Sequence, residues 1–236
     1  MTRSLHGIGA GPGDPELMTL RGLRLLREAN CVFLPATRPG ASFARPIVET
    51  YLDSSRQSIV ELVCPAYRDR SAVAARWLAL AGTVDDRLLE GKSGVFICEG
   101  DPSIYSTWVH LRSGIERLGA QIELHTVPGV SSVSAAAAAA DMPLAIWDER
   151  LLVTPAVRET SELRTLLAQA ETVALLKAGG DLDQLADSLD ALGPSVQAAM
   201  VRRAGRPEEQ ILHDTTAMRA ATPDYFTTII VRRCNT

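Results

Sequence analysis

The feature that most constrains this chain is the stretch at residues 94–107, GVFICEGDPSIYST. Its apolar run Val95-Phe96-Ile97-Cys98 is short and rich in β-branched and aromatic residues, which is typical of a buried strand. The glycine and proline that follow stop a strand and force a loop at its carboxyl end, where open α/β sheets bind small ligands. The same Gly-Asp-Pro tripeptide recurs at residues 13–15. We therefore expect two acidic turns that belong to one pocket.

Strands and helices alternate through the first half of the chain. Strands are expected at residues 5–10, 31–35, 58–63, 95–98 and 122–127. Helices are expected at residues 15–30, 43–52, 71–89 and 105–118, and in the alanine-rich segment after residue 132. Asp14 is a good N-cap for the first helix, and Pro15 suits its first position. A repeated strand–helix pattern predicts an α/β fold with a mainly parallel sheet.

The second half has a different pattern, which favours a second α/β domain with a mixed sheet. Its expected strands are residues 151–154, 172–176, 196–201, 209–213 and 225–232, and its expected helices are residues 161–169, 182–192 and 215–220. We place the boundary in the turn around Gly119, which gives domains at residues 1–120 and 121–236.

Composition excludes several classes of protein. The net charge of −4 argues against a nucleic-acid binder, which is usually basic. Of the 24 basic residues only Lys92 and Lys177 are lysines; the arginine excess reflects either genomic composition or binding of an anionic substrate. The four cysteines form no CxxC pair, so no disulfide framework or metal site is expected. No apolar run has the length of a membrane span, and we expect a cytoplasmic protein.

The glycines near the amino terminus do not form a dinucleotide-binding motif. Starting GxGxxG at Gly7 places Pro12 at the third glycine, and starting at Gly9 places Asp14 there. The second expected strand also ends without the acidic residue that would hold a ribose. A nicotinamide oxidoreductase is therefore a weak alternative, which binding of NAD would revive.

Four turns, at residues 9–14, 99–107, 128–132 and 202–205, resemble those of the tetrapyrrole methylase family in order and spacing. The resemblance covers nearly the whole chain, from GAGPGDPELMTL to the final YFTTIIV segment. It implies two α/β domains that bind S-adenosylmethionine (SAM) between them, and a homodimer. The turn GDPSIYST and the segment Ala204-Gly205-Arg206-Pro207-Glu208 are most similar to the precorrin-2 C20-methyltransferases of cobalamin biosynthesis. The substrate implied is an anionic reduced tetrapyrrole, precorrin-2 or cobalt-factor II.

By position, the resemblance implies a set of cofactor contacts: Pro12, Glu99, Gly100, Asp101, Ile104, Ser131, Ser132, Lys177 and Ala204. The Gly100 backbone can approach the ligand closely, and the Asp101 region can meet the cationic methionine amine. Many relatives carry methionine in place of Lys177. A lysine beside a sulfonium is unfavourable, so we expect its side chain to point away and its backbone to contact the ligand.

Methyl transfer to a reactive carbon mainly requires positioning, and a base is needed only to remove the C20 proton afterwards. The candidate catalytic residues are Asp14 and Tyr105, and Glu16 and His6 also lie near the expected turns. Asp14 fits a helix cap equally well, and a tyrosine at a helix start more often packs. Further substrate candidates, for each of which an ordinary surface or core role is the default, are Arg21, Arg38, Arg45, Trp108 and Trp147.

Two other functions within reach of this fold stay open. One is another tetrapyrrole methylase, such as a uroporphyrinogen-III methyltransferase. Glu99 and Ser106-Thr107 argue against it, because that group typically carries Gly-Gly-Asp-Pro and a closing glycine at these places. The other is a non-catalytic module that holds SAM or a tetrapyrrole; intact turns argue against that.

Overall fold

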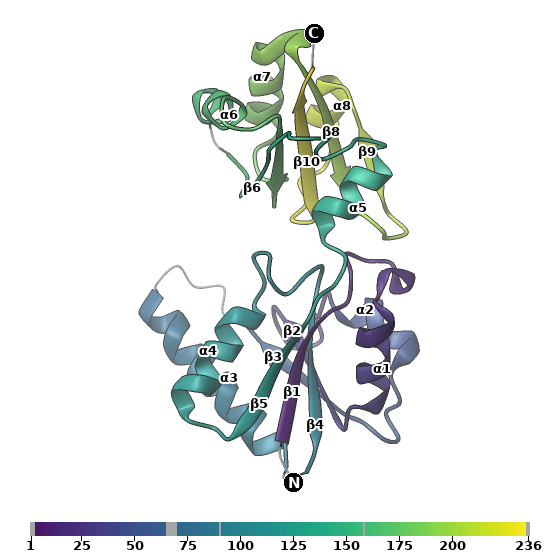
Figure 1. Cartoon of the computed structure of the whole chain (residues 1–236), viewed down its shortest axis with the longest axis vertical. Coiled ribbons are helices and arrows are strands. Elements are labelled where there is room, and N and C mark those ends of the chain that lie inside the picture. The colour runs from purple at the N-terminus through teal and green to yellow at the C-terminus, as the bar shows by residue number, and fades with distance from the viewer. Residues whose placement is uncertain (1–2, 65–69, 90, 158, 235–236) are drawn as a thin grey trace. The chain divides into compact units, whose positions relative to one another are not determined.

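The computed structural model describes residues 3–64, 70–89, 91–157 and 159–234. The chain divides into two compact units, Met1–Ser131 and Ser132–Thr236, and each is built on a five-stranded sheet covered by helices (Figure 1). The predicted α/β fold with two α/β domains is confirmed.

The sheet of the first unit is parallel throughout, as predicted. Its strands are β1 (Arg3–Gly9), β2 (Cys31–Ala36), β3 (Ser58–Val63), β4 (Ser93–Cys98) and β5 (Ile122–Val127). Their order is β3-β2-β4-β1-β5. The strands β4, β1 and β5 are therefore neighbours, and their carboxyl ends lie at one edge of the sheet.

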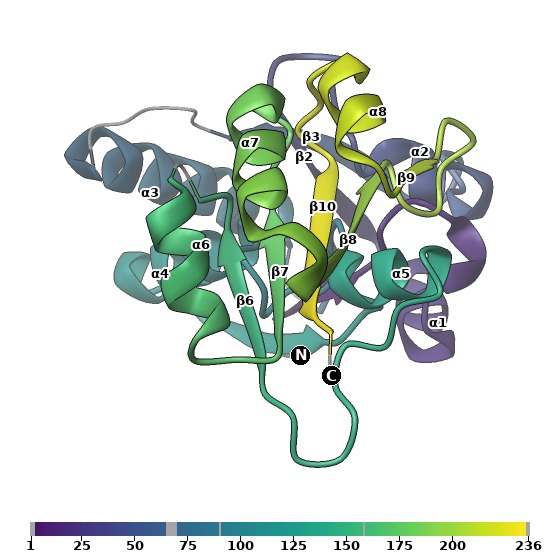
Figure 2. The ribbon, with the colours of Figure 1, turned by 90° about the horizontal axis from the view of Figure 1, so that it is seen from above.

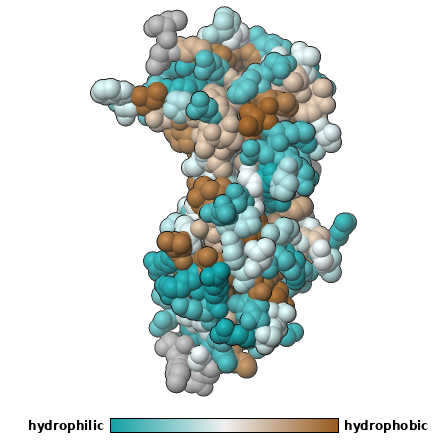
Figure 3. Space-filling model, turned by 90° about the vertical axis from the view of Figure 1, so that its right-hand side faces the viewer, coloured by the Kyte–Doolittle hydropathy of each residue, from teal (hydrophilic) through white to brown (hydrophobic). Residues whose placement is uncertain are grey.

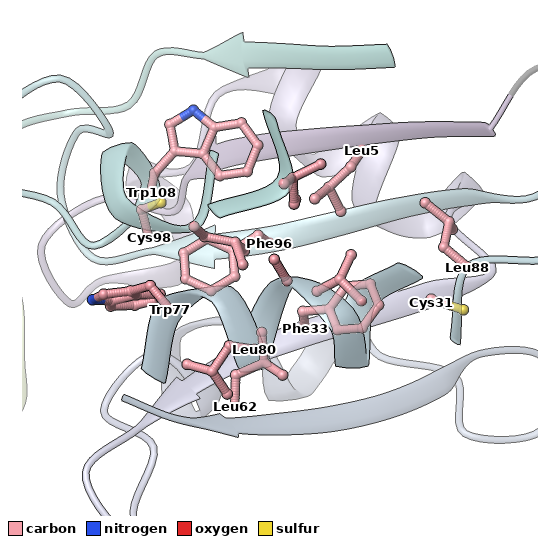
Figure 4. Packing of buried hydrophobic residues seen from close by; sticks show 14 residues of the cluster. Leu5, Cys31, Phe33, Leu62, Trp77, Leu80, Leu88, Phe96, Cys98 and Trp108 are labelled. Carbon is pink, nitrogen blue, oxygen red and sulfur yellow. The ribbon is translucent and has the colours of Figure 1, made fainter. Parts of the chain in front are cut away.

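Helices cover both faces of this sheet. They are α1 (Leu20–Glu28), α2 (Arg45–Val48), α3 (Arg70–Arg87) and α4 (Trp108–Leu118), with short 3-10 helices η1 (Pro15–Leu17) and η2 (Glu49–Tyr51). The helices α3 and α4 lie on one face, and α1 and α2 lie on the other (Figure 1). On the first face Trp77, Phe96 and Trp108 are buried together (Figure 4). Burial of such large side chains supplies the main driving force for folding.

The predicted boundary near residue 120 is wrong. The strand β5 pairs with β1 from Arg3↔Ile122 to Ile8↔Val127, so it completes the first sheet. Gly119 is the left-handed C-cap of α4, at φ 73°, inside the first unit. The division after Ser131 leaves each sheet whole, whereas a cut at residue 120 would leave the edge of β1 unpaired.

The first helix also differs from prediction. Asp14 caps η1 alone, and Met18 then takes an extended conformation (φ −71°, ψ 135°) that ends this turn. A second cap, Thr19, accepts a hydrogen bond from the N–H of Gly22 at 3.1 Å, and α1 begins at Leu20. The expected single helix is thus two elements with separate caps.

The sheet of the second unit is mixed, as predicted. Its strands are β6 (Leu151–Pro155), β7 (Thr172–Leu176), β8 (Val196–Arg202), β9 (Gln210–Leu212) and β10 (Thr227–Arg233). Their order is β6-β7-β10-β8-β9 (Figure 2). Among the strand pairs that the described residues form in this sheet, β6–β7 is the parallel one. The strand β10 runs antiparallel to both of its neighbours, and β9 runs antiparallel to β8.

Alternating residues of β10 face the two cores of this unit. Ile229 and Val231 pack with the helices α6 (Thr160–Leu167), α7 (Leu182–Leu192) and α8 (Thr215–Ala220). Ile230 faces the other way, toward α5 (Ser132–Ala139). The small side chains of α5 let it lie close to the sheet, as at Ala136, which is fully buried. A 3-10 helix, η3 (Gly193–Ser195), follows α7.

The surface mixes hydrophobic and hydrophilic residues over the face drawn in Figure 3. Scattered exposed apolar residues are normal for a globular protein. Within the described ranges, no helix combines the length and apolar character needed to cross a bilayer.

Candidate functional site

Three predicted turns converge at the carboxyl edge of the first sheet. The predicted turns at residues 9–14, 99–107 and 128–132 follow the adjacent strands β1, β4 and β5, and the last of them ends at Ser131 because α5 begins at Ser132. Gly11 and Gly100 form an antiparallel bridge, in which the Gly100 N–H donates to the Gly11 carbonyl at 2.7 Å and the Gly11 N–H donates back at 3.3 Å. The two acidic turns therefore lie side by side, as expected.

Glycine is required where these turns cross. A Cβ at Gly9 would lie 2.6 Å from the Gly100 carbonyl oxygen and 2.6 Å from the Gly129 nitrogen. A Cβ at Gly129 would lie 2.5 Å from the same oxygen. No side chain fits at these distances, so the backbones of all three turns are in direct contact.

The carboxylate of Asp101 ties two of the turns together. Its Oδ2 accepts from the N–H of Gly129 at 2.9 Å, and its Oδ1 accepts from the N–H of Ser103 at 2.8 Å and from the Ser103 hydroxyl. Burial would raise the pKa of Asp101, but the hydrogen bonds from Ser103 and Gly129 outweigh it and lower the pKa. The side chain therefore stays ionised and orders the site.

Asp14 acts as a cap. Its Oδ1 accepts from the N–H of Glu16 at 2.8 Å, and the side chain is half-buried. Pro12, two residues earlier, is buried, whereas Glu16 is exposed. The structure places Asp14 on the same turn as Pro12, and among the described residues the capping bond is the one hydrogen bond that its carboxylate accepts.

The remaining residues of the β4 turn are more accessible. Glu99 and Ile104 are half-buried, and Tyr105 is 51% exposed. The backbone of Tyr105 has φ 49°, a left-handed conformation that is rare for a residue with a bulky side chain. Tyr105 is therefore not helical, and α4 begins at Trp108 and not at Tyr105 as predicted. Strained backbone of this kind is often found at functional sites.

The segment between the units carries the two predicted serines. Ser131 is the last residue of the first unit, and Ser132 is the first residue of α5. Both are half-buried.

In the second unit, Lys177 and Ala204 lie on the turns that follow β7 and β8. Ala204 is buried, whereas Lys177 is exposed and has φ 57°. The Lys177 Nζ lies over the ring of Tyr225, 5.3 Å from its centroid. The ammonium charge is thereby held by an aromatic face.

His6 lies within β1 and not in a turn. Its ring stacks on that of His125, the residue paired with it on β5, with centroids 4.8 Å apart. Burial lowers the pKa of His6, and the electrostatic influence of His125, Arg21 and Arg24 lowers it further. Because His6 lies inside β1, before the turn at residues 9–14, the structure does not place it among the turn residues.

The two tryptophans have opposite environments. Trp108 is buried against Gly7 and Phe96, and its Nε1 donates to the Thr126 hydroxyl at 2.9 Å, so its core role is confirmed. Trp147, for which core packing was also the default, is 98% exposed. That default is wrong for Trp147, which lies in the segment that joins α5 to β6 and has a left-handed backbone conformation at φ 59°.

The three candidate arginines are spread over separate elements. Arg21 is exposed on α1, and Arg38 is exposed after β2. Arg45, at the start of α2, lies 3.3 Å from a carboxylate oxygen of Glu49 and 3.7 Å from one of Glu61. Binding of substrate carboxylates by these arginines stays a prediction.

Comparison with known proteins identifies the family. The model of the Tetrapyrrole (Corrin/Porphyrin) Methylases matches residues 4–218, which include the turns of both units. This chain belongs to the tetrapyrrole methylase family. The family predicted from the four turns is thereby confirmed.

Among this methylase's relatives is the cobalt-precorrin-2 C(20)-methyltransferase of Salmonella typhimurium, which is 33% identical over 99% of this chain and 98% of its own. The precorrin-2 C(20)-methyltransferase of a Sinorhizobium species is 30% identical over 84% of this chain and 83% of its own. The crystal structure of the cobalt precorrin-4 methyltransferase CbiF is similar with a TM-score of 0.72 and 28% identity, covering 97% of this chain and 94% of that one.

Sequence reasoning missed one residue of this methylase that organises the second unit. Asp224, just before β10, accepts a hydrogen bond from the Nε of Arg203 at 2.6 Å and meets the turns after both β7 and β8. Its position before the final strand, next to Pro223 and two aromatic residues, marks a turn. Nothing in that pattern reveals which distant turns it joins.

Proposed function

We propose that this protein transfers a methyl group from SAM to the C20 meso carbon of precorrin-2, or of its cobalt-containing form, in cobalamin biosynthesis. The observation that carries the proposal is the similarity, over nearly the full length of both chains, to a relative named for C20 methylation. A second relative is named precorrin-2 C(20)-methyltransferase, without the word cobalt. It supports C20 as the methylated carbon, and both forms of the substrate therefore stay in the proposal.

The residues at the turns fit SAM. Pro12 and Ala204 are small and buried, each in its own unit, and the half-buried Glu99 offers negative charge to a cationic donor. The backbone at Gly100 has φ 67° and carries no side chain, so a ligand can approach it closely. We propose that Ile104, Asp101, Ser131, Ser132 and the Lys177 backbone complete the donor contacts. Asp101 contributes mainly by ordering the turns, since both its oxygens already accept hydrogen bonds.

SAM supplies an electrophilic methyl group on a positively charged sulfur. The C20 carbon provides the electron pair of the new bond, the bond between sulfur and the methyl carbon breaks, and C20 then loses its proton. The protein's task is to hold the reacting atoms in line and exclude water. Asp14 and Tyr105 are the proposed acceptors of the C20 proton. Both belong to the bridged turns after β1 and β4.

The first experiment is incubation of the purified protein with labelled SAM and precorrin-2, with and without cobalt, followed by mass analysis of the product. A gain of one methyl on either substrate, located at C20 by NMR, supports the proposal. Binding of SAM without methylation of either substrate would contradict it. Uroporphyrinogen III is the control substrate, because its methylation would indicate the other branch of the family.

The proton-accepting role of Asp14 has a matched test. Asp14→Asn retains an oxygen that can accept from the Glu16 N–H, so the cap survives while the charge is lost. Asp53→Asn is the control, because Asp53 makes the same kind of turn with the N–H of Ser55 at 3.0 Å away from the bridged turns. A fall in kcat in the first variant alone supports the role; equal activity in both refutes it.

We also propose that the enzyme acts in the cytoplasm as a homodimer, as the resemblance to the family implies. Light scattering of the purified protein tests the dimer, and a monomer at micromolar concentration would contradict it.

A further inference from the structure

Three segments of the second unit meet at Asp224. The side chain of Asp224 is only 10% exposed. Its Oδ2 accepts from the Nε of Arg203 at 2.6 Å, and its Oδ1 accepts from the N–H of Phe226 at 2.8 Å. Its carbonyl oxygen accepts from the hydroxyl of Thr227 at 2.7 Å. The residue thus joins the turn after β8 to the start of β10.

The turn after β7 is fixed to the same place. A Cβ on Gly179 would lie 1.9 Å from the Asp224 carbonyl oxygen, so this turn lies directly against Asp224. The N–H of Ala178 also donates to the Thr227 carbonyl at 3.0 Å, and the N–H of Arg203 donates to the Phe226 carbonyl at 2.7 Å. Both turns are therefore attached to the segment at residues 224–227.

Each of the two turns contains a residue in a strained conformation. Lys177 has φ 57° and Arg203 has φ 52°, in the left-handed region that side-chain-bearing residues rarely adopt. Such conformations persist only where surrounding contacts hold them. Here the contacts are the Asp224 bonds and two cation–aromatic pairs, Lys177 over Tyr225 and Arg206 over Phe226.

The Arg203–Asp224 pair is charged on both sides. Burial would raise the pKa of Asp224, but hydrogen bonds from Arg203 and from the Phe226 N–H lower it. The hydrogen bond to Asp224 raises the pKa of Arg203. A charge-assisted bond of this length is among the stronger contacts a protein can place between two turns.

We propose that Arg203 and Asp224 are positioning residues for methyl transfer: they hold the turns after β7 and β8 so that the Lys177 backbone and Ala204 meet the donor. The inference rests on the proposed function, in which Lys177 and Ala204 contact SAM. Arg203 and Asp224 act through these turns. We therefore expect their loss to weaken the binding of SAM more than the binding of the tetrapyrrole.

The test compares Asp224→Asn, Arg203→Ala and Arg203→Lys with wild type. We measure the Kd of SAM by calorimetry, the KM of each substrate, and the unfolding midpoint. We expect Asp224→Asn and Arg203→Ala to weaken SAM binding and raise its KM roughly 10- to 100-fold, because misplacing contact groups has effects of that size. The KM of the tetrapyrrole should change by less than about twofold. Arg203→Lys, which keeps the positive charge, should recover part of the loss.

The control is Asp190→Asn in the same unit. Asp190 pairs with Arg219 at 2.7 Å and accepts from the Thr215 hydroxyl, joining α7 to α8 away from the two turns. Asp190→Asn should lower the unfolding midpoint without changing the Kd of SAM. That result would separate positioning from general stability.

Two outcomes would overturn the inference. One is an unchanged Kd of SAM in Asp224→Asn and Arg203→Ala; the other is an equal loss in the Asp190→Asn control. If Asp224→Asn does not fold, the two Arg203 variants decide, since that side chain is 40% exposed and its loss is tolerated more easily. A wild-type protein that does not bind SAM would instead refute the proposed function, and the positioning role with it.

Discussion

The crossing of the three turns in the first unit makes a sharp prediction for Gly129→Ala. The new Cβ would lie 2.5 Å from the Gly100 carbonyl oxygen and 2.7 Å from both the Cα and the carbonyl carbon of Gly9. All three atoms are backbone, so none can rotate away. Relief of the overlap requires the turns after β1, β4 and β5 to separate, which would also strain the hydrogen bond from the Gly129 N–H to Asp101.

The size of the effect follows from this geometry. Overpacking a well-packed interior costs about 1–3 kcal/mol, and a clash with three fixed backbone atoms belongs at the upper end, at about 3 kcal/mol. Gly82→Ala is the matched control, because a Cβ at Gly82 meets nothing within 4 Å and the residue lies inside α3. Exchanging a helical glycine for alanine gains about 0.5–1 kcal/mol. The same glycine-to-alanine change in the same unit should thus lower the free energy of unfolding at residue 129 and raise it at residue 82.

Urea denaturation followed by circular dichroism gives the free energy of unfolding of each variant, and calorimetry gives the Kd of SAM. We expect Gly129→Ala to lose both stability and SAM affinity, and Gly82→Ala to keep its affinity. A free energy of unfolding for Gly129→Ala within about 0.5 kcal/mol of wild type would refute the direct packing of the turns.

Three further predictions concern side chains at or near the turns. Asp101→Asn replaces the carboxylate that accepts from the Gly129 N–H with an amide, so the affinity for SAM, measured by calorimetry, should fall. An unchanged Kd of SAM would contradict a role of Asp101 in ordering the site. Because folding lowers the pKa of Asp101 from its ordinary value of 3.8, the ionised side chain contributes its full stabilisation above pH 3.8. This contribution is lost as the pH falls through the lower pKa of the folded protein. In an acid titration, the difference in free energy of unfolding between wild type and Asp101→Asn should therefore shrink below pH 3.8. Lys177→Met should bind SAM as well as wild type or better, since the lysine charge lies over Tyr225; a loss beyond about tenfold would show that the side chain contributes. The Cys98 thiol, whose pKa burial raises to about 12, should resist alkylation at about pH 8 until the protein is denatured, as mass spectrometry can check.

Local signals in the sequence predict most elements of the fold. The strand at residues 58–63 and the helix at residues 182–192 have the predicted bounds, since apolar periodicity and Gly or Pro terminators define them locally. The prediction of one continuous first helix was wrong because the second cap, Thr19, lies inside a continuous leucine pattern. The domain boundary was wrong because only pairing with β1 assigns β5 to the first sheet.

For the site, the sequence by itself determined the family and the residue types that the turns carry. Glycine, aspartate and proline at strand ends specify turns through their own backbone preferences, so the turns around Asp14 and Asp101 can be predicted without a structure. Only the tertiary structure decided that the backbones of Gly9, Gly100 and Gly129 are in contact. It also decided that the Asp101 carboxylate accepts hydrogen bonds from two of these turns, and that Asp224 holds the turns after β7 and β8. The reason is physical: these contacts join residues far apart in the chain, and their geometry depends on which strands become neighbours in each sheet.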